Sequence, residues 1–488
     1  MIKLLKNEWI KLSKKKSFLI LFFVVALVIF VNTLIAKNAN TETSNYSYYS
    51  YYYDNPQFLE QNLSSINKYS KEDYSYYIQL KADLKIVDLM KKYGKSSWQA
   101  YMLETRYQSD IMAFVEFEEF GKISDYTSEA EIKQNYEKLI SSLDGDWKNI
   151  AQTEKDEYLS QKKDLETKYD TTVDKLEKEN ISKQIFDIDL QIESIELRFT
   201  YDAEYGYNFK SRAISDYVAA KSTQESIKKK ETLKHSDKRE LQVAEETEAM
   251  SLQTLKEGID QYKPDEARGL IKEVVSSNAQ VIIIILIVFA AGIITDEFNK
   301  GTIKLLLIKP YTRTKILFAK FILILLLIPL FFLFAAVVQF VFAGLFFGLE
   351  SLSIPIWVYD FANHTIVNYN WFTYILKDFL CTLPMVLLLV TLAFSIATIS
   401  LSNVFAIIVS IMGLLAGEVI YMFAVSYNLA WLQLTPTMNW NLAEFSYGKL
   451  GIFSGMNTMS AIIICIIYFV IMLVVSKVVF KKHNIHNI

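Results

Sequence analysis

The chain contains six long apolar stretches, and these constrain its fold more than any other feature. A helix needs about 20 mostly apolar residues to cross the hydrocarbon core of a bilayer. Inside that core the backbone has to satisfy its own hydrogen bonds, which favours helices. We therefore expect an all-α membrane protein with transmembrane helices at 17–36, 279–295, 316–347, 372–399, 404–427 and 458–476.

A long acidic segment separates the first apolar stretch from the second. Residues 38–278 carry 33 Lys+Arg and 46 Asp+Glu, a net charge of −13, whereas the rest of the chain has a net charge of +10. Apolar residues recur at spacings of three and four, most clearly from Leu165 to Phe199, which predicts long antiparallel helices in a bundle or coiled-coil hairpin. Turns are expected at 144–147 and 236–238. Residues 37–278 thus form a separate helical domain in this interpretation, large enough for its own core.

Lysine and arginine close to the span ends predict the topology. Basic residues gather in 1–16, 300–320 and 477–482, whereas the loops at 348–371 and 428–457 carry almost none. We therefore expect a multi-pass plasma-membrane protein in which 1–16, 296–315 and the tail 477–488 are cytoplasmic. The acidic segment 37–278 is then extracellular, as is the outer loop with helices at 428–457.

The first 16 residues have two interpretations. Ile2, Leu5, Trp9 and Leu12 recur at helical spacing between lysines, as in a helix that lies at the membrane surface. A cleavable signal peptide is the alternative, but its apolar core usually has about 7–15 residues. The apolar run that follows here is longer, which favours an interfacial helix and a first span.

No pattern in the sequence indicates catalysis or metal binding. The four histidines and two cysteines share no ligand spacing. Gly94, Lys95 and Ser96 are reminiscent of a phosphate-binding loop, but such a loop needs a glycine five positions earlier, where Leu89 stands. We therefore expect neither enzymatic activity nor a cofactor in this chain, and no nucleic-acid partner.

The charged segment DEFNKGTIKLLLIKPYTRTK, residues 296–315, joins the second and third spans. Gly301 is expected to end the second span, Thr302 to cap a short helix at 303–308, and Pro310 to end that helix. Thr312 is then positioned to cap the third span. The leucines of the short helix need an apolar partner, which is the membrane surface, another part of the chain or a second protein.

This hairpin, EFNKGTIKLLLIKPYTRTKILFAK, resembles the segment after the second span of ABC-2 type permeases, the membrane subunits of ATP-binding cassette transporters. The N-terminal pattern LLKNEWIKLSKKKSFLILFF, with Glu8 and a basic run before the first span, is also similar to that family. The resemblance covers the membrane half, and the large acidic insert departs from the short outer loop of the simplest members. The hairpin residues that carry it are Glu297, Gly301, Thr302, Leu305, Leu306, Pro310 and Arg313.

The resemblance implies a division of labour between chains. Two permease chains, as a homodimer or heterodimer, would form the pathway within the lipid, and separate ATPase subunits would bind ATP and Mg beneath them. Each ATPase subunit would hold a coupling helix and drive the export or extraction of an amphipathic substrate such as a peptide, an antimicrobial compound or a lipid. The expected coupling residues are Glu297, Lys300, Gly301, Thr302, Ile303, Lys304, Leu305, Leu306, Ile308, Pro310 and Arg313.

Two other functions fit the same sequence. One is a membrane-anchored helical surface receptor or sensor, which has no need of the cytoplasmic hairpin. The other is a permease that transmits ATP-driven motion to its outer domain without moving a substrate. Glu418, an ionisable residue within the fifth span, is a candidate for the pathway or a dimer interface. Alternatively, its carboxyl group is neutral or hydrogen-bonded to a serine or tyrosine of a neighbouring helix.

Overall fold

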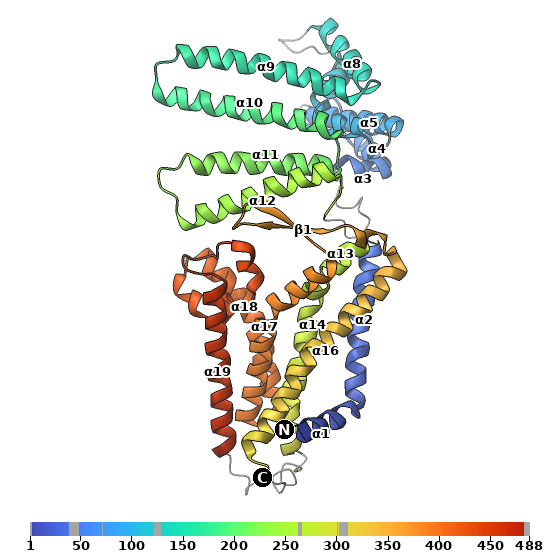
Figure 1. Cartoon of the computed structure of the whole chain (residues 1–488). Helices are drawn as coiled ribbons and strands as arrows, with labels where there is room; N and C mark the ends of the chain where they lie inside the picture. The colour runs from blue at the N-terminus through green and yellow to red at the C-terminus, as the bar shows by residue number, and fades with distance from the viewer. Residues whose placement is uncertain are drawn as a thin grey trace. The chain divides into compact units, whose positions relative to one another are not determined.

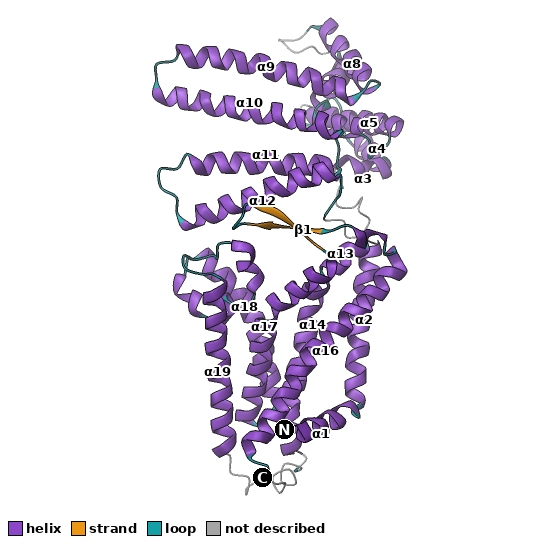
Figure 2. Ribbon diagram, viewed as in Figure 1, coloured by secondary structure: helices purple, strands orange, loops and turns teal. Residues whose placement is uncertain are grey.

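The computed structural model describes residues 2–38, 48–70, 72–121, 128–261, 266–299, 301 and 311–482. Nearly all of the regular structure in this part of the chain is helical (Figure 2), as the sequence predicts. The chain divides into two compact units. A membrane unit comprises Met1–Ala39, Thr232–Gln242 and Gln261–Ile488, and an insert unit comprises Asn40–Glu231 and Val243–Asp260.

Six helices among the described residues are long and apolar enough to cross a membrane, which confirms the six predicted spans. The second span is longer than expected, because three polar residues before residue 279 continue the helix. Among them, Asn278 is buried and its amide donates to the carbonyl of Val274 and to Oε1 of Gln339, at 2.8 and 2.7 Å. The six are α2 (Lys16–Asn38), α14 (Val274–Asn299), α16 (Arg313–Phe347), α17 (Trp371–Ser400), α18 (Asn403–Ser426) and α19 (Thr458–Lys482).

Helix α14 is the central helix of the membrane unit. Ile282, Leu286 and Ala290 are fully buried along its length, within one apolar core that α2, α16 and α17 share. A helix that is apolar on all sides is suited to such a position. Helix α2 contacts the core through aromatic rings, since Phe22 stacks on Phe331 of α16 with ring centroids 4.5 Å apart.

The membrane unit has two different ends (Figure 1). The basic end contains helix α1 (Ile2–Ser13), the last turn of α14, the first turns of α16 and the last turn of α19. The far end contains helix α13 (Ala267–Lys272), three short 3-10 helices in the predicted outer segment 428–457, and a β-hairpin. The 3-10 helices are η3 (Ala430–Leu434), η4 (Pro436–Met438) and η5 (Leu442–Gly448).

The β-hairpin was not predicted, since we expected only a loop at 348–371. After η2 (Glu350–Ser353), strand β1 (Ile356–Asp360) pairs antiparallel with β2 (Thr365–Tyr369). His364 takes a positive φ of 50° at the turn. Lys377 of α17 donates to the Tyr369 hydroxyl at 2.6 Å, and its Nζ lies 4.0 Å from the centroid of the Tyr369 ring. These two contacts hold β2 against α17.

The insert unit consists of α-helices and confirms a helical domain between the first two spans. Helices α9 and α10 form an antiparallel hairpin (Figure 1). The unit is smaller than the predicted 37–278, because 232–242 and 261–278 belong to the membrane unit and the boundary falls inside α12. Its helices are α3 (Tyr48–Asp54), α4 (Gln57–Ser65), α5 (Tyr74–Tyr93), α6 (Trp98–Thr105), α7 (Gln108–Phe120), α8 (Glu129–Leu143), α9 (Trp147–Thr171), α10 (Lys175–Tyr201), α11 (Phe209–Lys228) and part of α12 (His235–Glu257).

One predicted turn is confirmed and the other is wrong. Residues 144–146 separate α8 from α9, which begins at Trp147, and the Asp146 carboxylate caps α9 by accepting from the amide of Lys148. Residues 236–238 instead lie in the first turn of α12. There the Asp237 carboxylate accepts from the amide of Lys234 at 2.8 Å. The acidic residue that suggested a turn is therefore the third residue of a helix, and its side chain reaches back to the backbone amide before the helix.

Candidate functional site

Helix α1 buries only part of the apolar face predicted from the sequence, since Leu12 is buried and Leu5 is partly buried against the core. Leu4, Glu8 and Leu12, spaced by four residues, are buried, whereas Ile2 and Trp9 of the predicted apolar face are exposed. The helix therefore packs one face against the protein and leaves apolar side chains on the other, as suits a helix at a membrane surface. A glutamate in the middle of the buried face needs a partner.

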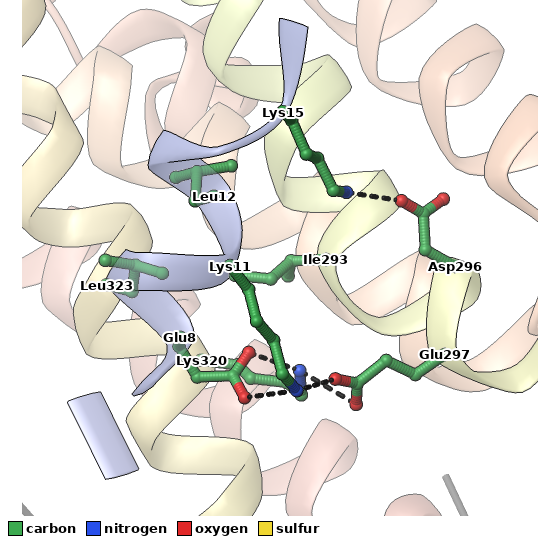
Figure 3. A pocket seen from close by; sticks show the side chains of 9 residues that line it. All are labelled: Glu8, Lys11, Leu12, Lys15, Ile293, Asp296, Glu297, Lys320 and Leu323. Carbon is green, nitrogen blue, oxygen red and sulfur yellow. Dashed lines mark hydrogen bonds and ion pairs between the residues drawn. The ribbon is translucent and has the colours of Figure 1, made fainter. Parts of the chain in front are cut away.

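Four charged side chains at the basic end form a closed ring, which we call the charge ring: Glu8, Lys11, Glu297 and Lys320 (Figure 3). Lys320 Nζ lies 2.7 Å from Glu8 Oε2 and 2.9 Å from Glu297 Oε2. Lys11 Nζ lies 3.0 Å from Glu297 Oε1 and 3.2 Å from Glu8 Oε1. Each lysine thus bridges both glutamates, and the ring joins α1, α14 and α16.

Three of the four side chains of the charge ring are buried, so the loss of an ion pair here is costly. Lys320 is 2% exposed, and Glu8 and Glu297 are 6% and 8% exposed. A buried charge is tolerated only when it is paired, and the loss of one partner leaves the other uncompensated. Positive and negative side chains alternate around the ring, and their formal charges cancel. Replacing any one of the four by a neutral residue therefore leaves a net charge in the ring.

A second ion pair lies beside the ring. Lys15 Nζ lies 2.7 Å from Asp296 Oδ2, between the start of the first span and the end of α14 (Figure 3). The ring and this pair line a cavity of about 270 Å³, whose apolar wall is formed by Leu12, Ile293 and Leu323. The charges of the lining side chains are balanced, so the cavity favours neither cations nor anions. Within the described residues, no group of three or more His, Cys, Asp or Glu is placed to hold a metal ion.

The pKa values of the two ring residues on α1 are shifted toward the charged forms of their side chains. Burial raises the pKa of Glu8, but Lys320 and Lys11 outweigh this effect and hold it below the ordinary value of 4.5. Burial lowers the pKa of Lys11, but Glu297 and Glu8 outweigh it and hold the pKa above 10.5. In both residues the ion pairs of the ring therefore outweigh the effect of burial and favour the charged form.

The ring connects the two helices that flank residues 300–310. Helix α14 ends at Asn299 and α16 begins at Arg313, and both are tied to α1 by the ring. Helix α19 joins the same end, because Arg313 donates to the carbonyl of Lys481 at 3.3 Å and Phe298 makes an edge contact with Phe480. Both flanking helix ends are therefore joined to α1 by ion pairs.

The predicted coupling residues have different outcomes. Glu297 is a member of the ring, and Gly301 has a φ of +64°, as expected of a residue that ends a helix. Thr312 precedes α16 as predicted, although its side chain accepts no capping hydrogen bond. Arg313 contacts α19 and is not part of the ring. The other predicted coupling residues lie outside the described part of the chain: Lys300, Thr302, Ile303, Lys304, Leu305, Leu306, Ile308 and Pro310.

The roles of Lys320 and Lys11 in the ring were not predicted from the sequence. As cations near the span ends, both indicated only the orientation of the spans. The signal for Lys320 was its place within the apolar run ILFAKFILILLL, since an ionisable residue inside a span usually has a partner. Lys11 was marked by its position three residues after Glu8, on the same helix face.

Glu418 lies apart from the ring, on the exposed surface of α18. Among the described residues, no hydrogen bond or ion pair to its side chain is present, so the alternative of a bond to a neighbouring serine or tyrosine is not found. The adjacent Gly417 is required for packing, since a Cβ at this position would lie 2.3 Å from the Trp440 ring.

Comparisons with known proteins give no activity, and one relative is described as a membrane protein. A family model described as "Protein of unknown function (DUF2705)" matches residues 256–486. The "Uncharacterized membrane protein YdbK" of Bacillus subtilis is 25% identical over 41% of this chain and 76% of its own length. The "Uncharacterized protein YhcI" of the same organism is 28% identical over 41% of this chain, and the chain covers 64% of that relative, less than two thirds. No solved structure matches.

Proposed function

We propose that this chain is the membrane subunit of an ATP-driven transporter of the ABC-2 type. The observation that carries the proposal is the charge ring. Glu8 and Glu297 belong to the two sequence patterns that resemble these permeases, and both carboxylates bind the same buried ammonium group, Lys320. Glu8 and Lys320 are 312 positions apart. If the N-terminal pattern and the hairpin pattern serve the same function, their residues are expected to lie together, as Glu8 and Glu297 do in the charge ring.

That purpose, in this proposal, is mechanical coupling. A separate ATPase subunit contacts residues 301–308 and moves them during ATP binding and hydrolysis. Because α14 and α16 flank this segment and are both tied to α1, the three helices move together as one body. A second permease chain completes the pathway, and the motion exposes it alternately to the two sides of the membrane. The substrate is an amphipathic compound, exported or extracted from the bilayer.

In the same proposal, both termini and the charge ring are cytoplasmic and the chain lies in the plasma membrane. The distribution of cations supports this orientation, because Lys3, Lys6, Lys315 and Lys481 all belong to the basic end. The insert unit is then extracellular.

The test is a purification of the tagged chain from membranes of its own host, followed by identification of bound proteins and measurement of vanadate-sensitive ATP hydrolysis. We expect a bound ATPase with phosphate-binding loops. A variant with Leu305→Asp and Leu306→Asp is expected to insert normally but to lose both the subunit and the hydrolysis. Lys315→Met, an exposed substitution outside the predicted apolar contact, serves as control. Undiminished co-purification and turnover in the leucine variant would refute the coupling role of this segment.

A further inference from the structure

An apolar groove lies in the far-end half of the membrane helices. It has a volume of about 550 Å³, within the range of roughly 300–1,000 Å³ common for ligand sites. Two ring contacts between α16 and α17 lie along it: Phe332 with Phe379 at 5.1 Å, and Phe340 with Trp371 at 5.6 Å. The remaining lining residues are also apolar: Val274, Val275, Pro329, Leu333, Ala336, Val337, Val341, Phe372, Ile375 and Leu376.

The groove is open at the outer surface of α16 and α17. Leu333, Val337 and Val341 on α16, and Phe372 and Leu376 on α17, are all exposed, between 48% and 65%. They form its rim. All five belong to helices that are long and apolar enough to span a membrane. The space between the rim residues of α16 and those of α17 is therefore expected to be in contact with the hydrocarbon core.

The groove is closed at the far end by α13. Ala267 and Ile271 of this helix pack against Phe340, Trp371 and Ile375, which also line the groove. Lys272 ends α13, two residues before Val274. Lys272 and Trp371 thus lie toward the closed end, and basic and aromatic side chains of this kind are common at the level of lipid headgroups.

The chemistry of the rim indicates what occupies the groove. Water is excluded because the lining offers it no hydrogen-bond partners. Helices that associate within a membrane approach through glycine, alanine, serine or threonine. The exposed rim has none of these and consists of leucine, valine and phenylalanine. A flexible apolar chain fits between such side chains better than a second helix does.

We propose that this groove is a binding site for one acyl chain of a membrane phospholipid, with the headgroup at the Trp371 and Lys272 end. The lipid enters sideways from the half of the bilayer nearest the far end. The ring pairs of α16 and α17 contact the acyl chain along its length. This inference rests on the membrane-spanning helices and does not require the ATP-driven function.

The test uses the purified full-length chain in nanodiscs that contain phosphatidylglycerol with a photoreactive diazirine on one acyl chain. After irradiation, mass spectrometry locates the adducts. We expect them to concentrate on 329–341 and 371–379. Ala336→Trp fills the groove and is expected to lower adduct yield there by about tenfold, the change that 1.4 kcal/mol produces. Leu345→Trp, on the same helix but exposed and outside the groove, is expected to leave the yield unchanged.

Two results would overturn the inference. One is an even spread of adducts over the exposed faces of α16, α17, α18 and α19 with no effect of Ala336→Trp. The other is efficient disulfide formation between two copies through Val337→Cys, since a second chain would then occupy the groove. If Ala336→Trp fails to fold, Val337→Trp blocks the groove from its exposed rim and gives the same readout.

Discussion

Replacing Lys320 by methionine tests the charge ring directly. The substitution keeps an unbranched side chain of similar length but removes the buried cation that lies within 2.9 Å of both Glu8 and Glu297. The two carboxylates then face each other with only Lys11 between them, and Lys11 is half exposed. Breaking a buried ion pair in this way costs about 3–5 kcal/mol. We expect this cost to appear as detachment of α1.

The assay is the reaction of a cysteine introduced in place of Leu12, which is buried on α1. The native Cys381 and Cys465 are replaced by alanine, and maleimide labelling is timed under native conditions. If opening of α1 becomes 3–5 kcal/mol easier, labelling should accelerate by roughly two to four orders of magnitude, at about 1.4 kcal/mol per tenfold. Lys315→Met, on the same helix as Lys320 and exposed, is the matched control and should change the rate less than about threefold.

A double variant distinguishes pairing from simple loss of packing. With Lys320→Met and Glu8→Gln together, Glu297 keeps Lys11 at 3.0 Å and no formal charge is left unbalanced. We expect the double variant to label more slowly than Lys320→Met alone, with a coupling energy of about 0.5–3 kcal/mol. Labelling of Lys320→Met at the control rate, or purely additive effects of the two substitutions, would refute the ring as an energetic unit.

Two further predictions concern pH and packing. The lowered pKa of Glu8 means that its contribution is present above 4.5 and is lost as pH falls below that value, whereas the raised pKa of Lys11 means that its contribution is present below 10.5 and is lost above it. The labelling rate of the Leu12→Cys thiol, corrected for thiolate content, should therefore stay constant between these limits, and a transition near pH 7 would contradict the assignment. In α18, Gly417→Ala should destabilise the chain by about 1–3 kcal/mol, because a Cβ would overlap the Trp440 ring. Gly413→Ala, one turn earlier, meets Leu392 at 3.4 Å and should be close to neutral in thermal unfolding, so equal effects of the two would be inconsistent with this packing.

Local sequence patterns were sufficient for the helices of this protein. Apolar runs located all six spans to within a few residues, and the turn predicted at 144–147 marked the boundary between α8 and α9. The β-hairpin shows the limit of such patterns. IWVYD and TIVNY are rich in aromatic and β-branched residues, as strands are, but the scarcity of cations around them indicated only the side of the membrane on which this loop lies.

The charge ring could be predicted only in part. Glu8 and Glu297 were marked by family-like patterns, and Lys320 by its apolar surroundings. Nothing in the local sequence indicates that Glu8 and Lys320, which are 312 positions apart, form an ion pair. That contact follows from the packing of α1 against α16, and α1 packs there through Leu4 and Leu12. Of the expected apolar face, Leu12 takes part in this contact whereas Ile2 and Trp9 are exposed, so the periodicity indicated the buried face only in part.

The most direct test of the proposed coupling is vanadate-sensitive ATP hydrolysis by the chain and its bound ATPase, compared among wild type, Lys315→Met and Lys320→Met in lipid nanodiscs. We predict that Lys315→Met hydrolyses ATP like the wild type. Lys320→Met should retain the bound ATPase, since residues 301–308 are unchanged, but lose most of the stimulation by the membrane subunit. Full stimulation in Lys320→Met, with α1 shown to be detached by labelling of the Leu12→Cys thiol, would contradict coupling through the charge ring.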